Sequence, residues 1–217
     1  MIFVEDHLIE SISSDARLKL HQPQPQEIAI MHDEPWEGTA SGYHNIFRNG
    51  DRYRMYYQSI HIDFPGGELR TDSHPRFCRY AESSDGIVWT GPGLVFYEFN
   101  GSKVNNIVLT SETMNGVAID AGNPAVLRDR NPGAPTRARY KAILKSSEKN
   151  GLIVLASADG IRWSPYFDHL ILRLKGAFDS QNLAFWDGSH FKRWNQAFLR
   201  PCPERPGTWH YGSPAIA

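Results

Sequence analysis

The chain has 217 residues, of which 41% are hydrophobic and 12% aromatic, so it is long enough to bury a core of its own. Its formal net charge at pH 7 is −1, which leaves no basic surface of the kind that binds nucleic acid. No apolar run approaches the length of a membrane-spanning helix. Nucleic acid and membranes are therefore not expected partners.

Residues 1–35 are expected to form a strap that leads into the folded part of the chain. Residues 1–15 contain acidic residues and lack the apolar core of a signal peptide, which favours a cytoplasmic location. Residues 22–25, with two prolines, predict an extended linker. Two cysteines, Cys78 and Cys202, cannot form a disulfide scaffold, so a pair of buried thiols is expected.

Short segments with alternating side chains follow the strap, and tight-turn signals separate them. Residues 43–48 form the first segment, and Asn49-Gly50 then supplies the positive φ angles that a hairpin into residues 52–57 requires. Residues 183–186 form another segment that begins a unit, the third start, and it runs into an Asp-Gly turn in the same way. Between these starts, further short strands are expected at residues 77–82, 123–126, 139–144 and 152–156.

One phrase, Ser-x-Asp-Gly-Ile-x-Trp, occurs at residues 83–89 and again at residues 157–163. In both copies the aspartate is expected to accept backbone N–H bonds within a turn, and the tryptophan to pack against the adjoining hairpin. A turn and a tryptophan that recur at long spacing indicate one supersecondary unit used more than once. The unit is an antiparallel meander, so the sequence predicts an all-β protein. Such meanders are the blades of β-propellers.

This order of segments resembles that of the five-bladed β-propeller glycosidases, the superfamily that contains glycoside hydrolase families 32 and 43. Besides the repeated phrase, the resemblance rests on Trp36-Glu37-Gly38 ahead of the first strand and on residues 178–188 at the third start. It extends over residues 1–192. It implies a β-propeller of antiparallel four-stranded blades, of which this chain supplies about two and a half where the family has five.

The resemblance divides the chain into a strap over residues 1–35, a partial propeller over residues 36–199 and an irregular tail over residues 200–217. The expected blades are residues 36–95, 96–170 and 171–199. An incomplete ring leaves strand edges open to pairing with other chains. The chain is therefore expected to be a fragment of a longer protein, or to self-associate through those edges.

The resemblance also implies a glycoside hydrolase that acts on an oligo- or polysaccharide, with no cofactor and no metal. Glycosidic cleavage uses one carboxylic acid to protonate the leaving oxygen and a second carboxylate as nucleophile or base. In propellers of this kind these groups lie on the innermost strands of successive blades. The candidates are the acids just upstream of each blade's first strand, Glu37, Asp120 and Asp179. Glu37 and Asp179 are the expected pair, with Asp120 or Asn182 orienting the substrate or tuning a pKa.

Each of the three acids also fits a structural role. Glu37 follows Asp33 and Glu34 and fits one more solvated acid on a loop. Asp120 lies between two nearby glycines and fits a turn, and Asp179 fits an Asx-turn. The alternative function is accordingly a non-catalytic carbohydrate-binding propeller, or an inactive fragment.

The expected contacts to the sugar are polar or aromatic residues close to these acids, namely Trp36, His44, Asn123, Gln181 and Asn182. Amide and imidazole groups would hydrogen-bond to hydroxyls, and the indole would stack on a sugar ring; ordinary packing is the alternative for the indole. His61 and Asp63 would share one strand face, but they lack the ligand number and spacing of a metal site. A solvated polar face is expected there instead.

Overall fold

The computed structural model describes residues 11, 19–71, 73–148, 151–167, 169–171, 178, 180–186, 188, 191–194, 200–201 and 209–210. Across those ranges the regular elements are β-strands and short 3-10 helices, and every pair of named neighbouring strands is antiparallel. The all-β class predicted from the sequence is therefore confirmed. Within the same ranges no helix is long and apolar enough to cross a membrane.

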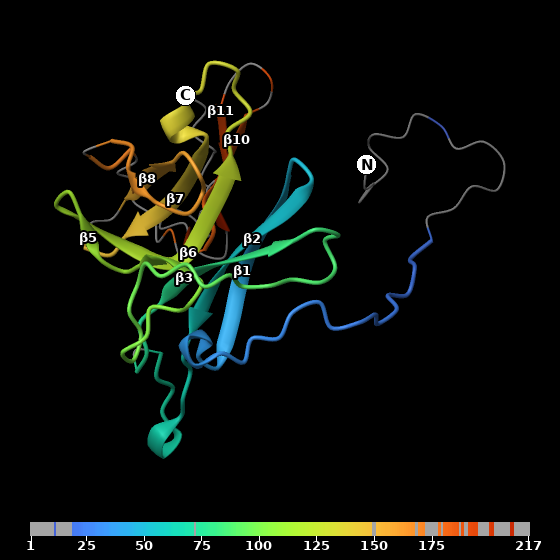
Figure 1. The fold of residues 1–217 in the computed structure, drawn as a ribbon, viewed down its shortest axis with the longest axis vertical. Coiled ribbons are helices and arrows are strands. Elements are labelled where there is room, and N and C mark those ends of the chain that lie inside the picture. The colour runs from blue at the N-terminus through green and yellow to red at the C-terminus, as the bar shows by residue number, and fades with distance from the viewer. Residues whose placement is uncertain are drawn as a thin grey trace.

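The N-terminal strap approaches the sheets as an extended segment over residues 19–33 (Figure 1). Its last part is held against the first sheet: the Ala29 carbonyl accepts a hydrogen bond from the backbone N–H of Trp89 at 3.3 Å, and Ile30 packs against the apolar cluster that contains Trp89. The strap then turns through the 3-10 helix η2 (Pro35–Glu37), where proline fixes a helical φ at the first turn. This short turn delivers Glu37 to the start of the first strand.

The first sheet has the strand order β1-β2-β3-β4, formed by β1 (Ala40–Asn49), β2 (Arg52–Ile60), β3 (Phe77–Ser83) and β4 (Ile107–Thr110). The β1-β2 hairpin closes at the pair Asn49 and Arg52, with Gly50 at φ 69°, as the Asn-Gly signal predicts. The 3-10 helix η3 (Pro65–Gly67) lies in the connection from β2 to β3. Because β4 pairs with β3, the first sheet extends beyond residue 95, where the boundary between the first two blades was expected.

The second sheet has the order β5-β6-β7-β8-β9. Its strands are β5 (Thr113–Met114), β6 (Val117–Arg128), β7 (Tyr140–Ser146), β8 (Leu152–Ser157) and β9 (Ser164–Pro165), with the 3-10 helix η4 (Thr136–Ala138) before β7. Two further pairs follow, β10 (Leu183–Trp186) with β11 (Phe191–Trp194) and β12 (Arg200–Pro201) with β13 (Trp209–His210). The last pair lies within the tail that was expected to be irregular; the remainder of that tail lies outside the described residues.

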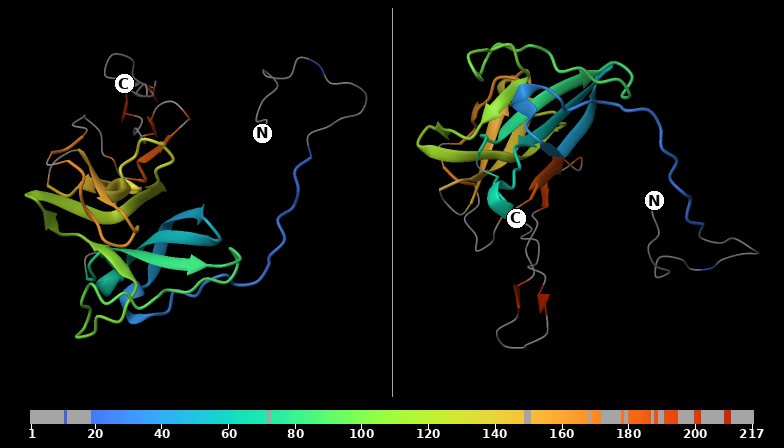
Figure 2. Two further views of the ribbon diagram at one scale, coloured as in Figure 1. Left: turned by 45° about the horizontal axis from the view of Figure 1, so that its top comes forward. Right: turned by 90° about the horizontal axis from the view of Figure 1, so that it is seen from below.

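The main core lies between the two sheets, which pack against each other (Figure 2). Successive strand residues point to opposite faces, so Tyr56 of β2 points into this core while Tyr57 points to the other side of the first sheet. The second sheet is buried on both faces: Ile153 and Leu155 of β8 enter the main core, and Val154 joins a separate cluster on the far side. This is why β8 is apolar along its length rather than alternating.

The two copies of the repeated phrase have the same local structure, as predicted. In each copy one aspartate oxygen accepts hydrogen bonds from backbone N–H groups two and three residues later, at 2.8 and 2.9 Å. The preceding serine hydroxyl donates to the same carboxylate, and the glycine has a φ of 81° in one copy and 80° in the other. Asp85 and Asp159 therefore form turns, and Trp89 is buried while Trp163 packs against the main core.

The second copy of the phrase has a tertiary role that the first does not share. Its turn lies on the inner face of the first sheet, where the Tyr56 hydroxyl donates to the Gly160 carbonyl at 2.9 Å and the Arg54 guanidinium donates to the Asp159 carbonyl. A Cβ atom at position 160 would lie 2.5 Å from the Tyr56 hydroxyl oxygen. Glycine is thus required there both for its φ and for the close approach of the two sheets.

Candidate functional site

The first long strands of the two sheets, β1 and β6, lie side by side and run in the same direction (Figure 1). The backbone N–H of Val126 on β6 donates to Asn45 Oδ1 on β1 at 2.9 Å. Near the far ends of both strands, the hydroxyl of Tyr140, which pairs with Arg128, donates to Asn49 Oδ1 at 2.9 Å. Side chains from two separate meanders therefore meet along one line.

Both strands interrupt their regular pairing at a similar height. In β1 the register shifts between Gly42 and Asn45, and Tyr43 between them has a φ of 53°. In β6 the register shifts between Asp120 and Ala125, which leaves residues 121–124 outside the ladder with β7. Bulges of this kind re-aim side chains and are frequent beside functional sites. The predicted residue Asn123 belongs to the interrupted stretch, and Asp120 is the last paired residue before it.

Asp120 lies in a small polar group at this interruption. Its Oδ1 accepts a hydrogen bond from the backbone N–H of Gly122 at 2.8 Å, and its Oδ2 lies 3.7 Å from Arg76 Nη1. The side chain of Gln58 reaches the same place. A Cβ atom added to Gly122 would lie 2.8 Å from Asp120 Oδ1 and 3.1 Å from Gln58 Nε2, so both side chains lie close to Gly122. The side chains of Asp120 and Arg76 remain 18% and 38% exposed, so a solute can reach this charged pair.

Gln181, predicted to contact substrate, joins the two strands instead. Its side-chain amide donates to the Tyr43 carbonyl at 2.7 Å, to the Pro124 carbonyl at 2.9 Å and to Asn45 Oδ1 at 3.2 Å. These acceptors belong to the interrupted stretches of β1 and β6. Gln181 thus joins β1 to β6 at the level where each strand's regular pairing is interrupted.

Asn182 and Asn123 are both buried next to this junction. The Asn182 amide donates to the Ser180 carbonyl at 2.8 Å, while its buried Oδ1 has no hydrogen-bond partner in the described part of the chain. A buried amide oxygen without a donor is an unsatisfied acceptor that water or a ligand hydroxyl would complete. Asp179, the other predicted catalytic acid, lies outside the described residues.

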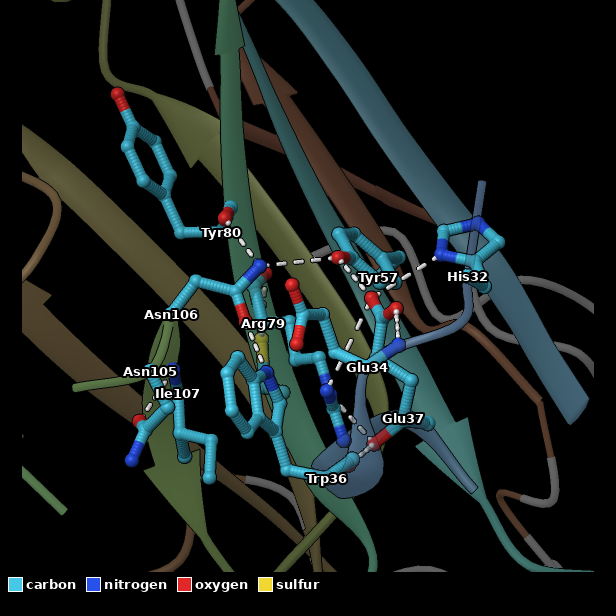
Figure 3. A network of polar contacts seen from close by, with 12 residues as sticks. His32, Glu34, Trp36, Glu37, Tyr57, Arg79, Tyr80, Asn105, Asn106 and Ile107 are labelled. Carbon is cyan, nitrogen blue, oxygen red and sulfur yellow. Dashed lines mark hydrogen bonds and ion pairs between the residues drawn. The ribbon is translucent and has the colours of Figure 1, made fainter. Parts of the chain in front are cut away.

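Glu37 occupies a second, separate polar network (Figure 3). Its carboxylate accepts hydrogen bonds from the Tyr57 hydroxyl at 2.7 Å and from the backbone N–H of Glu34 at 3.2 Å, and His32 Nδ1 lies 3.2 Å away. Arg79 Nη1 is 3.9 Å from the same carboxylate, and the Arg79 side chain is fully buried. With only 3% of its surface exposed, Glu37 is not the solvated acid of the alternative interpretation.

The surroundings of Glu37 keep it ionised. Burial by itself raises the pKa of its carboxyl, but the contacts from His32, Tyr57 and the Glu34 backbone, together with the charge of Arg79, outweigh burial and lower the pKa below its ordinary value. Burial lowers the pKa of Arg79 to about 10 against the attraction of its neighbours, so it stays charged at neutral pH. Burial and the neighbouring carboxylate raise the pKa of Tyr57, so the phenol keeps its proton.

Two of the predicted sugar-binding residues belong to this second network. The Trp36 indole N–H donates to Asn106 Oδ1 at 2.9 Å, and the Asn106 amide donates in turn to the Tyr57 hydroxyl at 3.0 Å. The His44 ring stacks on Tyr57, with ring centroids 5.4 Å apart, and its Nε2 lies 3.3 Å from Nε2 of His32. Burial and the neighbouring His32 lower the pKa of His44.

The structure does not bring Glu37 and Asp120 together. Glu37 contacts Tyr57, whereas Asp120 lies near Gln58, the next residue along β2. Because successive strand residues point to opposite faces, the two acids lie against opposite faces of the first sheet. Arg79 and Tyr57 were missed by sequence analysis; the polar Arg79 within an otherwise apolar strand, residues 77–81, is the signal that could have found the network.

Among the described residues no group of three or more His, Cys, Asp or Glu side chains is placed to hold a metal ion. His61, considered with Asp63 above, instead has its ring centroid 6.2 Å from that of His74.

Comparison with known proteins finds no matching family model, no matching curated protein and no matching solved structure.

Proposed function

We propose that this chain supplies neighbouring blades of a carbohydrate-active β-propeller. The meander β1-β2-β3-β4 would be one blade, β6-β7-β8-β9 the next, and β10 the beginning of a third. The proposal is supported by the neighbouring positions of β1, β6 and β10, since in a propeller the first strands of successive blades surround an axis. The resemblance of the sequence to propeller glycosidases suggests the same arrangement.

The saccharide site would lie at the interruption of β1 and β6. The observation that carries this proposal is the convergence of Asp120, Arg76 and Gln58 beside Gly122, at the height where both ladders open. Amide, guanidinium and carboxylate groups are the donors and acceptors that sugar hydroxyls require.

The reaction would be hydrolysis of a glycosidic bond by two carboxyl groups. We assign Asp120 as one of them because it is charged, partly exposed and at the junction. Asp179 is the proposed second, since it stands two positions before Gln181 in the sequence. Glu37, the sequence-based partner of Asp179, would serve instead to anchor the strap, because both of its oxygens are already engaged by protein donors.

The test is turnover on a panel of soluble oligosaccharides by the wild type and by Asp120→Asn and Asp179→Asn. Loss of a general acid or nucleophile is expected to lower kcat by at least about 100-fold in each variant. Asp51→Asn, at the exposed β1-β2 turn, is the matched control and should retain full activity. Unchanged kcat in Asp120→Asn would refute its catalytic role. Loss of turnover in Glu37→Gln with an unchanged melting temperature would show that Glu37 is a catalytic residue after all.

A second candidate is saccharide binding without cleavage. The observation that favours it is that Glu37 and Asp120, the described members of the predicted acid set, face opposite sides of one sheet, so they cannot flank a single bond. Under this function a bound oligosaccharide would be recovered intact after hours of incubation, and Asp120→Asn would weaken binding. Release of a shorter sugar by the wild type would exclude it.

A further inference from the structure

A hollow lies between β1 and β6, beyond the level at which Gln181 crosses from one strand to the other. It has a volume of about 190 Å³ and is lined by Asn45 and Arg48 from β1 and by Val126, Arg128 and the following Arg130 from the other side. The contacts of Gln181 to Asn45 and Pro124 separate this hollow from Asp120. It is therefore distinct from the site proposed for the saccharide.

Arginine supplies all the charged side chains that line the hollow, although the whole chain is close to neutral. Three of its described lining residues are arginines, and none of those lining residues is acidic. The acid nearest to them in the sequence, Asp129, is turned elsewhere: it accepts hydrogen bonds from Lys141 and from the backbone N–H of Asn131. Its charge is thereby compensated within the second sheet and does not neutralise the arginines.

We propose that this hollow, the arginine hollow, binds a tetrahedral oxyanion, a sulfate or a phosphate group. Arginine presents a planar fork of N–H donors that matches the oxygens of such groups, and two or three arginines around one anion are a common arrangement. The volume is below the roughly 300 Å³ at which sites for drug-sized molecules begin, which selects a compact group. Exposed Arg128 at the end of β6, and Arg130 just beyond it, would close on the anion from one side. Arg48 of β1, whose Nε donates to the Gly50 carbonyl, would offer its remaining N–H donors from the other side.

The experiment is isothermal titration calorimetry with sodium sulfate and with sodium phosphate, at an ionic strength held constant with sodium chloride. Saturable binding to the wild type is expected. The variant Arg128→Gln/Arg130→Gln should bind at least about tenfold more weakly, because two charge-assisted contacts are lost. Arg48→Gln, on the opposite wall, should also weaken binding. No saturable binding to the wild type would overturn the proposal.

The matched control is Arg70→Gln/Lys103→Gln, which removes the same charge from exposed positions outside the hollow. It should bind sulfate like the wild type. An equal loss of affinity in the two double variants would show that only overall charge matters, and would overturn the proposal. Because all these side chains are exposed, the variants are expected to melt within about 2 °C of the wild type, which excludes misfolding as the cause.

The same titration distinguishes a free oxyanion from a substituent of a sugar. A monosaccharide monosulfate that binds at least about tenfold more tightly than sulfate would identify the sugar ester as the ligand, and equal affinity would identify the free anion. Both results support an oxyanion site. Binding of the uncharged parent sugar as tightly as its sulfate, unaffected by the arginine substitutions, would contradict it.

Discussion

A single buried carboxylate organises the first sheet and the strap that crosses it. Glu37 is in contact with His32 on the strap, with Tyr57 on β2 and with Arg79 on β3. Breaking such a set by removing one charge costs more than the net value of the intact set, because the remaining charge stays buried without compensation. Glu37 is therefore expected to matter for stability even where it takes no part in chemistry.

Glu37→Gln should lower the free energy of unfolding at pH 7 by about 3 kcal/mol, since Arg79 keeps its charge in a buried place. Because the folded state lowers the pKa of Glu37, its contribution is fully present above the ordinary value of 4.5 and is lost as pH falls through the lowered value. Urea unfolding between pH 7 and pH 3 should therefore show a shallower decline for the variant than for the wild type.

The control for that measurement is Glu98→Gln, an exposed acid whose replacement should change stability by less than about 0.5 kcal/mol. Parallel stability curves for Glu37→Gln and the wild type over the acidic range would show that the carboxylate is not ionised in the way described.

At the scale of elements, local sequence patterns predicted the strands and turns, but they did not predict which strands pair with each other. Asn49-Gly50 and the two Asp-Gly turns were readable because positive φ angles need particular residues. The strand β4 was missed because it follows a long irregular connection and is recognised only by its pairing with β3. The Glu37 network was unpredictable for a similar reason: it requires the register in which Tyr57 lies opposite Arg79.

The repeated turn provides a test of how the two sheets dock. Gly160→Ala introduces a methyl group 2.5 Å from the Tyr56 hydroxyl, at a φ of 80°, and should destabilise the protein by about 3 kcal/mol. Gly101→Ala is a matched control, since Gly101 has the same φ and no described atom within 4 Å. It should cost about 1 kcal/mol, the conformational part alone.

Thermal and urea unfolding measure the difference between these two variants. Equal losses of unfolding free energy in Gly160→Ala and Gly101→Ala would mean that the turn does not pack against Tyr56 in solution.

For the whole molecule, the junction of β1, β6 and the segment before β10 decides whether separate meanders act as one unit. Gln181 contributes three hydrogen bonds to this junction, and Asn45, one of its partners, also accepts from Val126. The sequence indicated only that a polar residue precedes an apolar strand. That one amide would join two sheets depends on the matching bulges of β1 and β6, which arise from tertiary packing.

Gln181→Ala should lower the free energy of unfolding by about 2 kcal/mol, because two backbone carbonyls lose a half-buried donor. Amide hydrogen exchange at Val126 should also become faster, since its acceptor Asn45 is no longer held. Gln26→Ala, on the exposed strap, is the control and should leave both quantities unchanged. Unaltered exchange at Val126 in Gln181→Ala would show that the sheets are coupled elsewhere.

The apolar strand β8 has a consequence for how the protein is made. Its residue Val154 is covered on the outer side by a cluster that includes Phe178 and Ala184, and both of these are synthesised later. During translation Leu152–Ser157 therefore leaves the ribosome before its cover exists. We expect a nascent chain stalled at this stage to be captured by chaperones that recognise extended apolar segments, and to be released once β10 has emerged.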